Sequence, residues 1–125
     1  MDISLTDREL DVMEVLWDRG SATVAEVRDA IADDLAYTTV LTILRILEEK
    51  GRVRHEEEGR AHRYFPLVER QAVRRSALRR LTKKLFQGSP ELLLTQLVAD
   101  QGLSDEEIRK LRRLLEDRLR ADKKK

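Results

Sequence analysis

The chain has 125 residues, of which 41% are hydrophobic, 39% are charged and only 4% are aromatic. This composition is typical of a soluble, helix-rich protein with a core of Leu, Val and Ile, and the length allows one domain or two small ones. The absence of cysteine excludes disulfides, thiolate catalysis and thiolate metal sites. The sequence contains neither a transmembrane-length apolar run nor a signal peptide, so we expect a cytoplasmic protein without membrane insertion.

The net charge of +1 hides an asymmetry along the chain. Residues 1–68 contain nine Lys and Arg against fifteen Asp and Glu, a net charge of −6, and residues 69–125 contain sixteen against nine, a net charge of +7. Nucleic-acid binding therefore cannot be argued from overall charge. It would require the basic side chains of the acidic N-terminal part to gather on one surface.

The first helix is predicted from its start signals. Thr6 and Glu9 have the spacing of a capping box, and Leu5 and Leu10 are placed to form a hydrophobic staple across the first turn. The helix should end before Gly20. The side chains that it should offer to a core are Leu10, Met13, Leu16 and Trp17.

A second, shorter helix is predicted after a second capping box, formed by Thr23 and Glu26. The residues from Asp33 to Ala36 then connect it to a third helix. This order is that of a helix-turn-helix motif. The predicted buried side of the second helix consists of Val24, Val27, Ala30 and Ile31.

The third helix is predicted over residues 37–50, with Gly51 ending it. Its many β-branched residues make a strand a fair alternative, but the apolar period is nearer 3.6 than 2. The predicted buried face consists of Val40, Ile43, Leu44 and Leu47. The opposite, outer face consists of Thr38, Leu41, Thr42 and Arg45.

This outer face suits the DNA major groove. Short hydroxyls can meet phosphates or base edges, an exposed leucine can meet thymine methyls, and an arginine can meet guanine. The plainer alternative is a solvent-exposed face on which threonines are tolerated. Taken by itself, this helix does not distinguish the two interpretations.

A β-hairpin is predicted behind the helix-turn-helix, from strands at 53–57 and 61–65 around a Glu58-Gly59 turn. With that turn, His55 would face His62 and Arg54 would face Arg63. A hairpin in this position is a wing, and wings contact the DNA backbone or the minor groove. Arg60 at the tip and Arg63 behind it are therefore candidate DNA contacts.

The sequence gives little support for catalysis or for a metal site. The two histidines suggest a metal site, but ring nitrogens on a wing more often contact solvent or phosphate, and the spacing offers no third ligand. We therefore predict no metal and no cofactor. Because the sequence contains no glycine-rich phosphate loop or nucleophile elbow, we expect no enzyme. The rival to DNA binding is a winged-helix protein-interaction module, which would be favoured if the arginines at 45, 52, 60 and 63 were dispersed.

The C-terminal part is predicted to be helical, with a domain boundary near residue 68. A basic amphipathic helix covers residues 69–86, Ser89 and Pro90 open a second helix, and Ser104 with Glu107 opens a third. Three short helices so rich in leucine are too few to bury one another. The simplest way to bury the remaining leucines is a homodimer, in which the partner chain covers this apolar surface.

Four segments resemble the penicillinase and methicillin-resistance repressor family of winged-helix regulators. These are Leu-Thr-Asp-Arg-Glu-Leu-Asp-Val-Met-Glu-Val-Leu-Trp at 5–17, Ala-Tyr-Thr-Thr-Val-Leu-Thr-Ile-Leu at 36–44, Gly-Arg-Ala-His-Arg-Tyr-Phe-Pro at 59–66 and Leu-Ser-Asp-Glu-Glu-Ile at 103–108. The similarity runs almost from end to end. It implies a mainly α fold with a small β-hairpin wing, in which residues 1–68 form a winged helix-turn-helix domain and residues 69–125 a three-helix dimerisation domain.

The resemblance also implies a function, namely a transcriptional repressor that binds an inverted-repeat operator in double-stranded DNA as a homodimer. Family residues at the positions of Thr38, Thr39, Leu41 and Thr42 lie in the major groove, and an arginine is common where this chain has Ile46. Relatives that respond to β-lactams are cut by a membrane sensor protease, a further partner, between an asparagine and a phenylalanine. The matching bond in this chain is Gln96-Leu97, which departs from that pattern at both positions. Copper-responsive relatives use C-terminal cysteines, which this chain lacks.

Overall fold

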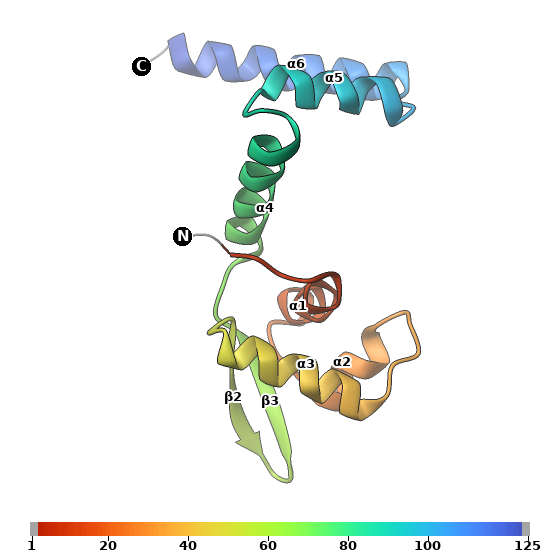
Figure 1. Cartoon of the computed structure of the whole chain (residues 1–125), viewed down its shortest axis with the longest axis vertical. Helices are drawn as coiled ribbons and strands as arrows, with labels where there is room; N and C mark the ends of the chain where they lie inside the picture. Colours follow the sequence, from red (N-terminus) through yellow and green to blue (C-terminus); the bar gives the residue numbers. More distant parts are fainter. Residues whose placement is uncertain (1–2, 124–125) are drawn as a thin grey trace. The chain divides into compact units, whose positions relative to one another are not determined.

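The computed structural model describes residues 3–123, which fall into two compact units, residues 3–79 and 80–123. The first unit contains α1 (Asp7–Arg19), β1 (Ala22–Thr23), α2 (Val24–Ala30), α3 (Tyr37–Glu49), β2 (Val53–Glu58), β3 (Ala61–Pro66) and the beginning of α4 (Arg70–Leu85). The second unit contains the end of α4, α5 (Pro90–Asp100) and α6 (Asp105–Lys123) (Figure 1). The mainly α fold with a small hairpin wing is confirmed.

The predicted capping boxes begin the helices. The Glu9 backbone N–H donates to Thr6 Oγ1 over 3.1 Å, and the Thr6 N–H donates to Glu9 Oε1 over 2.8 Å. Thr23 with Glu26 at α2, and Ser104 with Glu107 at α6, make the same reciprocal pair. Each box satisfies two backbone donors that the helix itself leaves unpaired, so the local sequence is sufficient to place these helix starts.

The end of α3 has the hydrogen bonds of a Schellman motif. Lys50 is the C-cap and Gly51 follows it with φ +77°, so the helix ends one residue earlier than the predicted Gly51 cap. The Gly51 N–H donates to the Glu48 carbonyl over 3.0 Å, and the Arg52 N–H donates to the Leu47 carbonyl over 2.9 Å. This turn reverses the direction of the chain, and β2 follows it.

The sheet has three antiparallel strands in the order β1-β3-β2, and its register corrects the prediction. His55 pairs with Tyr64 and Glu56 pairs with Arg63, so the tight turn is Gly59-Arg60 rather than Glu58-Gly59. Gly59 adopts φ +63°, which suits a glycine at the first turn position. The two-residue β1, which pairs with β3, is too short to show an alternating pattern and was not predicted.

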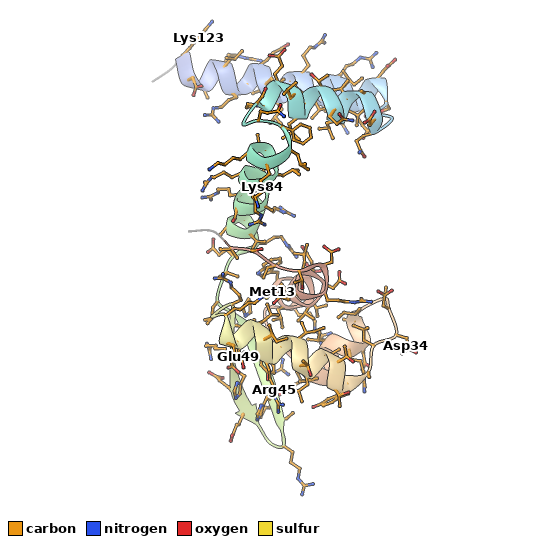
Figure 2. All side chains as sticks on the ribbon, viewed as in Figure 1. Met13, Asp34, Arg45, Glu49, Lys84 and Lys123 are labelled. Atoms are coloured by element: carbon orange, nitrogen blue, oxygen red, sulfur yellow. The ribbon has the colours of Figure 1, made fainter. Side chains whose placement is uncertain are left out.

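The core of the first unit lies where α1, α2, α3 and the sheet meet. Two predicted core residues, Leu10 and Ala30, are exposed instead. Leu10 is 37% exposed because the buried side of α1 runs through Val12, Met13 and Leu16, and Ala30 lies at the exposed end of α2. The main buried residues are Val12, Met13, Leu16, Ala22, Val24, Val27, Val40, Leu44, Leu47, Val53 and Tyr64. Figure 2 shows Met13 on α1.

Glu9 connects the start of α1 to the end of α3. Its side chain is 5% exposed, and its carboxylate lies 2.9 Å from the Lys50 ammonium. Burial alone raises the pKa of Glu9, but the hydrogen bond from the Thr6 backbone and the charge of Lys50 outweigh it and hold the pKa below its ordinary value. The ionised carboxylate therefore stabilises the packing of α1 against α3.

The second unit leaves much apolar surface uncovered. Neither α5 nor α6 contains a buried residue among those the structure describes. On α6, Leu114 is 65% exposed and Leu119 is 63% exposed. Across residues 3–123, every helix is too short or too polar to cross a membrane.

Candidate nucleic-acid interface

The outer face of α3 is open to solvent, as predicted for most of its residues. Thr38, Thr39, Thr42 and Arg45 are exposed. The Thr42 hydroxyl donates to the Thr38 carbonyl over 2.9 Å, which leaves its oxygen lone pairs available to accept hydrogen bonds. Leu41 differs from the prediction, because it is half-buried and packs partly against the core.

A hollow of about 120 Å³ lies between α3 and the wing. It brings Arg45 and Leu41 of α3 together with Arg60 of the wing tip, three residues that the sequence had proposed as DNA contacts. Figure 2 shows Arg45 beside the hairpin, on the side of α3 away from α1. The other residues that line the hollow are Val24, Tyr37 and His62.

Tyr37 and His62 were not among the predicted contacts. Tyr37 begins α3 and also lies under the Arg28 guanidinium, whose central carbon is 5.9 Å from the ring centroid. His62 was weighed as a metal ligand against a wing side chain that contacts solvent or phosphate, and the second interpretation was preferred. It lines the hollow because the wing packs beside α3, an arrangement that the local sequence does not show.

The ion pairs of residues 3–68 separate the basic side chains into two groups. Most of them lie within 4 Å of a carboxylate, namely Arg8, Arg19, Arg28, Lys50, Arg54 and Arg63. In the same range Arg45, Arg52 and Arg60 have no carboxylate at that distance, and two of these three line the hollow. The acidic side chains of this unit are thus partly neutralised elsewhere, while free positive charge gathers beside α3.

Arg63 is held away from the hollow. Its guanidinium lies 3.1 Å from Glu58 and 3.1 Å from Glu26, and Nη1 donates to the Ser21 hydroxyl over 3.3 Å. The hydrogen bond to Glu58, followed by the charge of Glu26, raises the pKa of Arg63 above its ordinary value. The predicted DNA contact by Arg63 would have to compete with these two carboxylates.

The two histidines do approach each other, although they are not direct cross-strand partners. Their rings stack with centroids 4.4 Å apart and an interplanar angle of 14°. His55 Nδ1 also lies 2.6 Å from Oε2 of Glu48 on α3. Within residues 3–123, the structure contains no group of three His, Cys, Asp or Glu side chains arranged to hold a metal ion.

Comparison with known proteins decides the family. The penicillinase repressor family model matches residues 5–117. The chain belongs to the penicillinase repressor family. This is a family of transcriptional repressors rather than enzymes, and the resemblance inferred from the four segments is thereby confirmed.

The similar proteins match either most of this chain or about half of it. The penicillinase repressor of Bacillus licheniformis is 27% identical over 115 residues, 90% of each chain. The transcriptional regulator BlaI of Mycobacterium tuberculosis strain H37Rv is 46% identical over 66 residues, which is 50% of this chain and 48% of the relative. The solution structure of the DNA-binding domain of the repressor BlaI superimposes with a TM-score of 0.50 and 31% identity, covering 56% of this chain and 90% of that one.

Proposed function

We propose that this penicillinase repressor family member binds double-stranded operator DNA through α3 and the wing, and thereby represses transcription. The observation that carries the proposal is the gathering of Arg45 and Arg60 at one hollow, without carboxylate partners, in a unit whose other basic side chains are mostly paired. Phosphate contacts supply most of the affinity of such complexes. A protein-interaction module would not require this separation of charge.

Sequence preference is assigned to the exposed face of α3. Thr38, Thr39 and Thr42 present hydroxyls and methyls, Leu41 adds a partly exposed apolar edge, and Arg45 can reach a guanine or a phosphate. The helix is long enough to enter a major groove and its inner face is held by the core, so the outer face is presented rigidly. Arg60, at the exposed turn of the wing, is assigned to the backbone.

The operator is proposed to be an inverted repeat bound by a homodimer. The second unit supports this part, because its leucines lie on helices that bury none of their own residues. An apolar surface of this kind is covered when a second copy packs against it, and two-fold symmetry then matches two half-sites.

Release from DNA is proposed to follow cleavage at Gln96-Leu97 by a sensor protease. Both residues are exposed near the middle of α5, where the Gln96 amide donates to the Asp100 carboxylate. Because proteases act on extended backbone, α5 would have to open locally before cleavage. A repressor of this kind acts in the cytoplasm, where its operator lies.

The test is fluorescence-anisotropy binding of the purified chain to its own upstream DNA and to a shuffled duplex, at two salt concentrations. We expect a dimer-stoichiometric complex that prefers the upstream DNA by on the order of a thousandfold. Equal and weak binding to both duplexes that disappears with added salt would contradict the proposal and favour a protein partner.

A further inference from the structure

His62 occupies the same hollow as the two unpaired arginines. Arg45 and Arg60 line it with Tyr37, and the apolar side chains of Val24 and Leu41 complete it. The hollow therefore combines two permanent positive charges, a phenolic hydroxyl and an imidazole next to the exposed face of α3. A phosphate group, with oxygens that accept hydrogen bonds from all of these donors, fits that chemistry.

His55, the second histidine of the wing, stacks on His62 and is itself bound from α3. Glu48 binds His55 Nδ1 at 2.6 Å with one oxygen and at 2.9 Å with the other, and the His55 ring stacks on His62 at 4.4 Å. The ring centroids of Tyr64 and His55 lie 5.4 Å apart, with the two rings tilted by 44°. His55 is thus engaged by a protein carboxylate, whereas His62 is presented to the hollow.

We propose that the hollow binds one phosphate of the DNA backbone and that His62 binds it as an imidazolium, so that complex formation takes up a proton. This inference rests on the proposed function, because the phosphate belongs to the DNA that α3 and the wing are proposed to bind. It adds a binding residue, His62, and a dependence on pH.

The sign of the pH effect follows from charge. His62 lies with Arg45 and Arg60 at the hollow, and Glu57 is its cross-strand partner. The remaining neighbours are His55, Glu48, Tyr64 and Tyr37. A phosphate adds negative charge to this set, so His62 binds a proton more strongly in the complex than in the free protein, and affinity rises as pH falls.

The composition of the chain makes this effect measurable. It has two histidines, 55 and 62, and no cysteine. Histidine is the side chain that ordinarily changes charge between about pH 5 and 8. A change of DNA affinity within that range can therefore be assigned by substituting two neighbouring rings.

The experiment measures anisotropy binding of the full chain to its upstream duplex at about pH 6 and about pH 7.5. The variants are His62→Gln and the matched control His55→Gln, which removes the ring bound by Glu48. We expect the full chain to bind about threefold to tenfold more tightly at the lower pH, with a salt slope steeper by about 0.9. His62→Gln should lose both effects, and His55→Gln should keep them.

A second variant, His62→Lys, carries a permanent charge and should bind with similar affinity at both pH values. It also tests the assignment if His62→Gln reduces folding, which thermal unfolding would reveal. Affinity of the full chain that does not change with pH, or a pH effect that survives in His62→Gln, overturns the inference. Loss of discrimination against the shuffled duplex at about pH 7.5 would instead overturn the proposed function itself.

Discussion

Arg60 and Arg63 belong to the same wing but are expected to contribute differently to DNA binding. Arg60 lies in the exposed turn without a carboxylate partner, whereas Arg63 lies 3.1 Å from each of two carboxylates. An arginine that neutralises one phosphate releases condensed counterions and contributes about 0.9 to the slope of log affinity against log salt. Arg60→Gln should therefore lower the steepness of that slope by about 0.9.

The size of this effect is within reach of a titration. For a fourfold increase in salt, from about 50 to 200 mM, one phosphate contact corresponds to about a 3.5-fold loss of affinity. The parent chain should lose about 3.5-fold more affinity over this range than Arg60→Gln does, on upstream and shuffled duplexes alike.

Arg63→Gln is the matched control in the same hairpin. Its guanidinium is already paired with Glu26 and Glu58, so we expect little change of the salt slope and little change in the free energy of unfolding. Anisotropy at four salt concentrations and urea unfolding measure the two quantities. The reasoning is refuted if Arg60→Gln leaves the salt slope unchanged, or if Arg63→Gln lowers it by the same amount. In either case, the carboxylate partners would not decide which arginine contacts a phosphate.

Three further predictions concern base readout, folding and assembly. Thr42→Ala or Leu41→Ala should each reduce discrimination between operator and shuffled DNA by about 1 to 3 kcal/mol if the side chain contacts a base, and full discrimination in competition binding would exclude that contact. Glu9→Ala should lower the free energy of unfolding by about 2 kcal/mol at neutral pH in urea titrations, with Glu9→Gln milder because it keeps the capping acceptor. The pKa of Glu9 is lowered in the folded chain, so its contribution to stability is present above the ordinary glutamate pKa and disappears as pH falls through the lower folded value. The difference in unfolding free energy between the parent chain and Glu9→Gln should therefore shrink in acid. Leu114→Glu should yield monomers in sedimentation experiments, and dimers of unchanged stability would contradict the use of α6 as the interface.

Several parts of the interface were predictable because their signals are local. The threonine face of α3 follows from a helical period, and the wing from two short runs around a glycine. Leu41 was placed on the correct side but with too much exposure, because the sequence does not show how closely α2 and the wing approach that side. The hairpin turn was displaced by one residue along the chain, since Glu58-Gly59 and Gly59-Arg60 are both plausible turn pairs.

Three capping boxes, the glycine that ends α3 and the order of helices and hairpin are all set by residues close together in the chain. Such features depend on backbone donors within a few residues of the side chains that satisfy them. The charges that remain available for DNA, in contrast, depend on how the folded elements pack. Glu26 lies 37 residues before Arg63, and Arg45 meets Arg60 only once the helix and the wing have packed. Because Coulomb interactions depend on distance in space, the acidic composition of the first unit did not predict the positive hollow on its surface.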